Sequence, residues 1–143
     1  MSYRFLEDLS IADTAFEATG KTLKEVFESS ALAVTNTMIR NLESIEQKVK
    51  KKIKVESDTA EMLLFNFLQE LVFYKDAEQL IFSRFNVDIA PIGKKWKLSV
   101  IAYGEKLDKE KHQWVVDVKA VTLHHFELKE TDSGWRAQVV LDI

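Results

Sequence analysis

The residues whose chemistry stands out lie near the two ends of the chain. Asp13 falls in an early segment, and Asp142 stands one residue before the terminal carboxylate of Ile143, within an alternating apolar pattern. Chain ends usually fray in solvent, so an acidic residue held in a strand at this position is unusual. If folding brings Asp13 against this end, three carboxylate groups share a small volume. Like charges at such a short distance favour protonation of one group or recruitment of a cation.

Such a set of ligands consists of oxygen atoms only, which favours a hard cation. Calcium is the first expectation, with magnesium or manganese as alternatives and zinc disfavoured. Three acidic groups and one main-chain carbonyl would not fill calcium's shell of about six to eight ligands, so water or a partner's atoms would have to complete it. Taken alone, Asp13 is one acid among 23 and also fits a solvated turn residue.

Composition and charge narrow the class of protein. A chain of 143 residues with 46% hydrophobic residues predicts one domain over residues 1–143 with a proper core. The sequence has no cysteine, which excludes disulfides and cysteine-bound zinc and is compatible with the cytoplasmic location that we expect. It shows no signal peptide and no membrane-spanning apolar run. The net charge of −3 disfavours tight binding of RNA or DNA by this chain alone and fits a protein partner that itself holds RNA.

The first part of the sequence predicts two extended segments, residues 3–9 and 11–19, and then a helix. Thr22 and Glu25 have the spacing of a capping box, which satisfies two free amide groups at a helix start. We expect this helix to end near residues 40–41.

A strand over residues 48–56 and a second helix, capped by Ser57 or Asp58, come next. In the strand-like segment that follows, the apolar alternation shifts phase, which predicts a β-bulge near Arg84. Residues 131–134 predict a hairpin turn before the last strand. The pattern indicates an α+β fold: a two-layer domain with a mostly antiparallel sheet and two helices packed on one face.

The three histidines and a charged pair are further candidates. On a regular strand the adjacent His124 and His125 face opposite sides, so they serve one site only if a bulge intervenes. A partly buried, hydrogen-bonded ring is the simpler interpretation for each histidine, including His112. By strand parity Asp117 and Lys119 share a face, either as an exposed charge pair or as a docking surface.

Five lysines gather in the strand over residues 48–56. They could contact phosphates, but the solvated face of an edge strand is the simpler interpretation because no aromatic residue is interleaved among them. The lysines are Lys48, Lys50, Lys51, Lys52 and Lys54. Arg84, at the predicted bulge, either points toward a site or pairs with a nearby acid.

Catalytic motifs are missing from the sequence. It contains no glycine-rich phosphate loop and no nucleophile elbow, and Ser10, Ser83 and Ser99 have no neighbouring base in the sequence. We therefore expect a protein that is not an enzyme. A metal-dependent phosphoesterase built on the acidic residues is the alternative, and it would turn over substrate unaided.

Three stretches resemble the archease family, in the right order along the chain. They are Ala12-Asp13 through Gly20 to Phe27, the run from Leu80 to Phe85, and the run from Val118 to His124 that continues to the Leu-Asp-Ile ending. The sequence departs from the family at three places: Ser10-Ile11 replaces His-Thr, Ala15 replaces glycine, and His125 replaces the glycine that usually follows the histidine.

The resemblance implies a function and a site. Archeases activate the RtcB-type tRNA-splicing RNA ligase, which uses GTP and manganese to guanylylate its own histidine, and some have been viewed as chaperone-like modulators of RNA-modifying enzymes. Carried over, the family's divalent-cation ligands are Asp13, Asp142 and Ile143. The most recognisable family strand implies a partner surface at Asp117, Lys119 and His124. RNA would be contacted indirectly, through the ligase.

Overall fold

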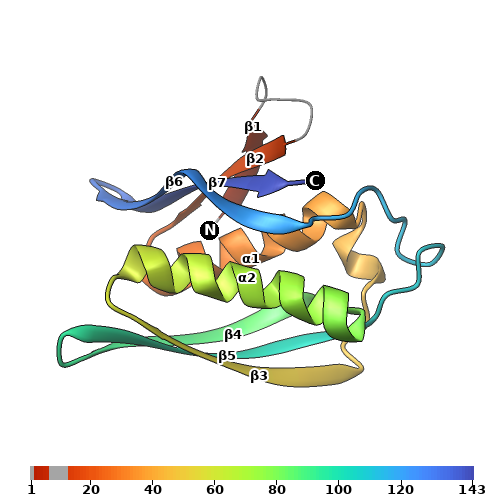
Figure 1. Cartoon of the computed structure of the whole chain (residues 1–143), viewed down its shortest axis with the longest axis horizontal. Helices are drawn as coiled ribbons and strands as arrows, with labels where there is room; N and C mark the ends of the chain where they lie inside the picture. Colours follow the sequence, from red (N-terminus) through yellow and green to blue (C-terminus); the bar gives the residue numbers. More distant parts are fainter. Residues whose placement is uncertain (1, 7–12) are drawn as a thin grey trace.

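The computed structural model describes residues 2–6 and 13–143, and it consists of two antiparallel sheets with two helices between them (Figure 1). One sheet has the order β1-β2-β7-β6, and its strands are β1 (Ser2–Leu6), β2 (Asp13–Gly20), β7 (Gly134–Asp142) and β6 (Ala120–Thr131). The other has the order β3-β5-β4, and its strands are β3 (Val49–Ser57), β5 (Lys95–Lys106) and β4 (Leu80–Ile92). The helices are α1 (Leu23–Met38), α2 (Ala60–Glu78) and the short 3₁₀ helix η1 (Leu42–Ser44).

The α+β class, the two helices and the antiparallel pairing are confirmed. The strands form two sheets, so α1 and α2 make a middle layer instead of covering one face of a single sheet (Figure 1). Parts of both predicted N-terminal segments, residues 7–9 and 11–12, lie outside the described residues, and so does Ser10. No helix in the described ranges has the length and apolar character that a bilayer crossing requires.

Helix capping was predicted correctly for α1 and wrongly for α2. The hydroxyl of Thr22 accepts a hydrogen bond from the Glu25 amide at 3.2 Å. In α2 the cap is Thr59, whose hydroxyl accepts from the Met62 amide at 3.1 Å. The predicted cap Ser57 still belongs to β3, opposite Trp96 in β5, so the helix starts later than expected.

The bulge near Arg84 is confirmed and shapes the core. The pairing of β4 with β5 shifts between Phe82 and Arg84, and therefore both Phe82 and Phe85 are buried. Their rings lie 6.3 Å apart, and Phe85 also meets the ring of Phe67 from α2 at 6.1 Å, edge to face. Phe67 in turn stacks at 6.2 Å on Phe27 of α1, so one aromatic cluster joins both helices to the β3-β5-β4 sheet.

The long connection from β5 to β6, residues 107–119, carries the chain from one sheet to the other, and a buried histidine fixes its first part. His112 is fully buried. Its Nδ1 accepts from the Asp108 amide at 3.0 Å, so the ring proton lies on Nε2, which donates to Glu105 Oε2 at 2.9 Å. The simpler interpretation of His112, a buried and hydrogen-bonded ring, is confirmed.

A buried lysine fixes the second part of the connection. Lys75 of α2 is 5% exposed, and its ammonium group donates to Asp117 Oδ1 at 2.5 Å and to the Val118 carbonyl at 2.7 Å. The same group lies 2.6 Å from an oxygen of Asp76. Lys75 continues the buried stripe of α2, four residues after Leu71, where a lysine requires charged or polar partners. It therefore places the chain just before β6.

Glu105 gives the fold a specific dependence on pH. Burial alone would raise its pKa, but hydrogen bonds from the Glu46 amide, Lys111 and His112 outweigh this effect and lower the pKa to about 2. A carboxylate with a depressed pKa in the folded state contributes stability above its ordinary pKa and loses it as pH falls toward the folded value. We expect Glu105→Gln to remove a contribution of about 3 kcal/mol at neutral pH.

Urea unfolding of both proteins between neutral pH and about pH 2 measures this contribution. The gap in unfolding free energy between wild type and Glu105→Gln should close as pH falls below the ordinary glutamate pKa. A gap that stays constant over this range would contradict the role assigned to the Glu105 carboxylate.

Lys75→Met should destabilise the fold by about 1–3 kcal/mol, because Asp117 and the Val118 carbonyl lose a charged donor. The matched control is Lys51→Met, which removes a partly exposed pair with Glu78 (3.0 Å) and should cost less than about 1 kcal/mol. Urea unfolding gives both values. In addition, amide exchange at Lys119 should accelerate only in Lys75→Met, and equal effects of the two variants would contradict the anchoring role.

Candidate metal centre

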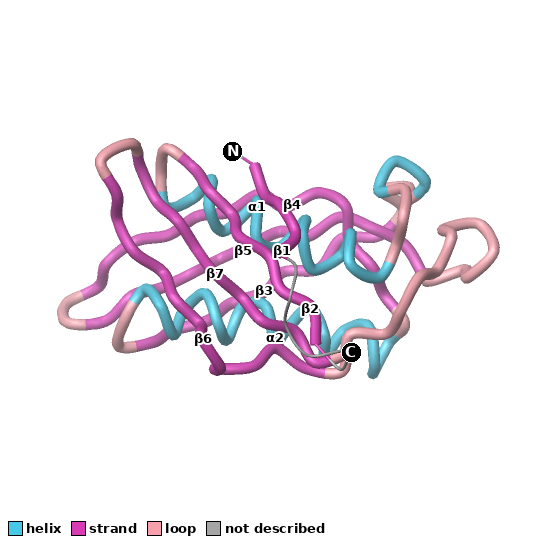
Figure 2. Tube along the Cα trace, turned by 90° about the horizontal axis from the view of Figure 1, so that it is seen from above, coloured by secondary structure: helices cyan, strands magenta, loops and turns pink. Residues whose placement is uncertain are grey.

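The structure brings Asp13 and Asp142 together. They lie directly opposite each other in the antiparallel β2–β7 pair, Asp13 as the first residue of β2 and Asp142 as the last of β7. Side chains at directly opposed positions project from the same face of a sheet, with Cβ atoms about 4.5–5.5 Å apart. Figure 2 shows the C-terminus beside the start of β2. Folding therefore brings the early aspartate alongside the last residues of the sequence.

These two carboxylates lie on the outer face of the sheet. In β7 the alternate residues Ala137, Val139 and Leu141 are fully buried against the helices, so Asp142 projects in the opposite direction. Asp13, Asp142 and Ile143 are all partly exposed. The pair is thus accessible from outside the molecule, and the carboxyl end of Ile143 follows it by one residue.

We call the place where Asp13, Asp142 and Ile143 lie the acidic corner. The start of β6 adjoins it. The Lys119 amide donates to the Asp142 carbonyl at 2.8 Å, and Ala120 lies opposite Asp142 in the β6–β7 pair. Lys119 and Asp142 are consequently neighbours through the backbone. Because Lys75 holds Asp117 and Val118, the buried lysine of α2 also fixes the chain that fastens Asp142.

The donor set at this corner is composed of oxygen atoms, which fits a hard cation such as calcium, magnesium or manganese. Among the described residues no group of three or more His, Asp or Glu side chains is arranged so that it could hold a metal ion. Two aspartates and the terminal oxygens would therefore leave coordination positions for water or for another molecule. A cation at this corner stays a prediction from the type of its ligand atoms.

The three predicted partner residues have different surroundings. Asp117 and Lys119 precede β6 and are not in a strand, so the strand parity that assigned them a shared face does not apply. Lys75 donates to Asp117 and to the Val118 carbonyl at this point of the chain. Asp117 has a structural role, and Lys119 adjoins the acidic corner. His124 lies four residues into β6, on the exposed edge strand.

A strand irregularity brings His124 and His125 together. The β6–β7 register shifts between Thr122 and Glu127, and His125 has a positive φ of 53°. The two rings lie 4.1 Å apart and both residues are exposed, so they do not face opposite sides as a regular strand would require. Glycine adopts this backbone conformation freely, whereas a residue with a side chain such as His125 adopts it less readily.

An ion-pair ladder stabilises the outer face of the same sheet. Arg136 of β7 donates to Glu17 of β2 at 3.0 Å and to Glu127 of β6 at 2.8 Å. Burial alone would raise the pKa of Glu17, but Arg136 and Arg4 outweigh it and lower that pKa. The ladder ties β2, β7 and β6 together, and it lies beyond the acidic corner along the strands.

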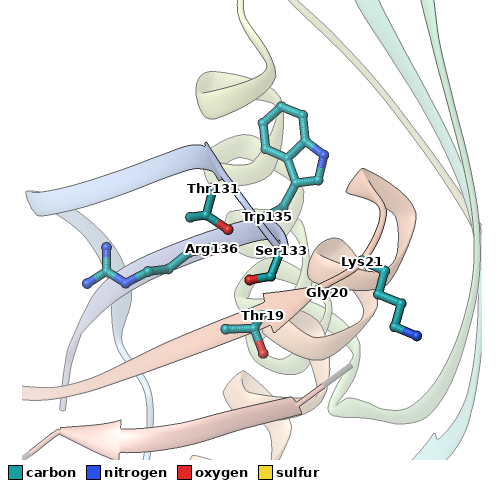
Figure 3. Close-up of a pocket in the computed structure, with 7 residues that line it drawn as sticks. All are labelled: Thr19, Gly20, Lys21, Thr131, Ser133, Trp135 and Arg136. Carbon is teal, nitrogen blue, oxygen red and sulfur yellow. The ribbon is translucent and has the colours of Figure 1, made fainter.

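A cleft of about 380 Å³ lies at the other end of the β2–β7 pair (Figure 3). Its lining includes Thr19, Ser133 and Trp135, which the sequence did not indicate as site residues. In Figure 3 the charged groups of Lys21 and Arg136 point away from each other, and Arg136 is engaged in the ion-pair ladder. Among the described residues that line the cleft, no charged or catalytic side chains converge.

Comparisons with known proteins agree with the architecture. The archease protein family model matches residues 3–143. Protein archease of Pyrococcus abyssi is 41% identical over 133 residues, which cover 92% of this chain and 93% of the relative. Protein archease of Methanosarcina mazei is 36% identical over 142 residues, 99% of this chain and 95% of the relative.

Two solved structures share the fold. The solution structure of Methanobacterium thermoautotrophicum protein 1598 is 34% identical, with a TM-score of 0.86 and coverage of 99% of this chain and 98% of that one. The crystal structure of an archease from Thermotoga maritima, described as a possible chaperone, is 16% identical with a TM-score of 0.59 and covers 98% of each chain. With a family match over nearly its whole length, this chain belongs to the archease family.

Proposed function

We propose that this chain is a non-enzymatic activator of an RtcB-type RNA ligase and acts through a divalent cation, calcium first, held by Asp13, Asp142 and the terminal oxygens of Ile143. The observation that carries the proposal is the register of β2 and β7, which sets Asp13 directly opposite Asp142 at an accessible corner. Membership of the archease family supports the ligase as the partner.

The physical logic is an incomplete ligand shell. A divalent cation at this corner supplies positive charge that a triphosphate and its leaving group require. Asp13 and Asp142 offer their carboxylates from one face of the sheet, and the Lys119 amide holds the backbone of Asp142 in place. Coordination positions left open can accept phosphate or protein oxygens of the ligase, so the corner is suited to promote guanylylation of the ligase.

The positions of Lys119 and His124 indicate where the ligase would dock. Lys119 adjoins the acidic corner, and its side chain is exposed, so we propose that it contacts the docked ligase. His124 would contribute from the edge strand β6, whereas Asp117 acts indirectly by accepting from Lys75. A chaperone-like role toward RNA-modifying enzymes is a second candidate, supported by the description of the Thermotoga maritima relative as a possible chaperone.

The ligase assay tests the proposal directly. Substoichiometric amounts of this protein should sustain many ligation cycles of the cognate ligase. Asp13→Asn and Asp142→Asn should each reduce this stimulation by about tenfold or more, since each removes one charged ligand. The matched control, Asp132→Asn, makes the same change in the β6–β7 turn and should retain stimulation.

Circular dichroism of each variant separates a lost ligand from a lost fold. Full stimulation by folded Asp13→Asn and Asp142→Asn would contradict the proposal. Release of product from an RNA 2′,3′-cyclic phosphate by this chain alone would favour the phosphoesterase alternative instead.

Cation binding has its own prediction. Addition of Mn²⁺ to the ¹⁵N-labelled protein should broaden amide signals around residues 13, 119 and 142 before others, because a paramagnetic ion relaxes the nuclei nearest to it. Appending two glycines after Ile143 displaces the terminal carboxylate and should weaken binding by about tenfold. Unchanged broadening in the extended protein would exclude that carboxylate as a ligand.

A further inference from the structure

The outer face of the β3-β5-β4 sheet carries a cluster of cations that only the strand pairing reveals. Strand alternation places Lys50, Lys52 and Lys54 on the side of β3 that faces away from the helices, whereas Ile53 is buried. Their cross-strand neighbours in β5 are Tyr103, Ile101 and Ser99. Arg84 follows on β4 opposite Tyr103, and Lys97 lies opposite Glu56 on the same face. We call these five cations the basic face: Lys50, Lys52, Lys54, Arg84 and Lys97.

The basic face differs from the other lysines of β3 in its partners. Lys51 pairs with Glu78 at 3.0 Å, and Lys48 lies 3.4 Å from Glu46. Across the part of the chain that the structure describes, the five cations of the basic face form no ion pair within 4.0 Å. Asp88, the acid in the row of Lys54, lies two strands away, about 10 Å across the sheet. The positive charge therefore remains available to an outside partner.

An aromatic ring and hydrogen-bond donors complete this surface. The guanidinium of Arg84 lies over the ring of Tyr103 at 5.3 Å, and the Asn86 amide group donates to the Tyr103 hydroxyl at 3.4 Å. Arg84 thus stacks on Tyr103 and forms no ion pair with an acid in the part of the chain that the structure describes. No aromatic residue is interleaved among the lysines of β3 in the sequence. Tyr103 of β5 supplies an aromatic ring directly opposite Lys50.

The spacing and shape of the face fit a phosphate chain. Alternate residues of a strand lie about 7 Å apart, which is comparable to the separation of successive phosphates in an extended single strand of RNA. Lys52, Lys54, Lys97 and Ser99 line a shallow depression of about 290 Å³, with Asp88 and Ala90 on its β4 side. Several donors thus surround a space large enough for a phosphate group.

We propose that the basic face contacts the phosphate backbone of single-stranded RNA that the ligase holds, an inference that rests on the proposed function. The face lies on the opposite side of the three-layer molecule from the outer face that carries Asp13 and Asp142 (Figure 1). A ligase docked on the acidic corner consequently leaves the basic face open. The chain as a whole has a net charge of −3, so the contact is weak in isolation and gains effect when the ligase raises the local RNA concentration.

The experiment uses the isolated protein, so it is independent of ligase stimulation. A short single-stranded RNA is titrated into the ¹⁵N-labelled chain at low salt, and chemical shifts and fluorescence anisotropy are followed. Shift changes should concentrate on β3, β5 and β4. The triple variant Lys50→Gln, Lys52→Gln, Lys54→Gln should bind about tenfold or more weakly, and its log–log salt slope should fall by about 2.

The matched control removes three exposed lysines from separate places, as Lys21→Gln, Lys109→Gln, Lys129→Gln, and should change the affinity by less than about twofold. An equal loss in both triple variants would overturn the proposal, because it would show that only net charge matters. Shift changes elsewhere, or no binding at low salt, would overturn it as well. If a poly-glutamate peptide of equal charge produces the same shifts at equal affinity, the occupant is an acidic protein surface and RNA is rejected.

Discussion

The antiparallel pairing of β2 with β7 is the constraint on which the rest of the structure depends. Phe16 opposite Val139 and Ala18 opposite Ala137 are fully buried, so a slip of one residue would expose this apolar set. At the far end, a Cβ on Gly134 would stand 2.3 Å from the Gly20 carbonyl oxygen, which shows how closely the hairpin turn packs there. Burial of the core thereby fixes which residue of β7 meets Asp13.

The same sheet fixes the positions of the two carboxylates. Core residues on the inner face hold the register, and the Arg136 ladder stabilises the outer face beyond the acidic corner. The buried Lys75 and the Lys119 amide add a second support from α2 and β6. The position of the acidic corner is thus fixed by the surrounding fold.

Local patterns predicted much of the fold. Alternation indicated an apolar face in β7, the Thr22 cap set the start of α1, and the phase shift located the bulge near Arg84. The division into two sheets was not predictable in this way, because alternation shows which residues share a face but not which strands pair. The register confirms that Asp13 lies opposite Asp142, and the cation-binding role that the family resemblance implies for them stays a prediction. Lys75 was missed, although it continues the buried stripe of α2, and Tyr103 joins the lysines only through cross-strand pairing.

The most direct test of the central claim is a crystal structure of this protein grown with Mn²⁺, with anomalous scattering recorded to locate the ion. The account predicts one anomalous peak between the Asp13 and Asp142 carboxylates, within coordination distance of an oxygen of Ile143. A map with no peak at this corner, and with the two carboxylates turned away from each other into solvent, would contradict it.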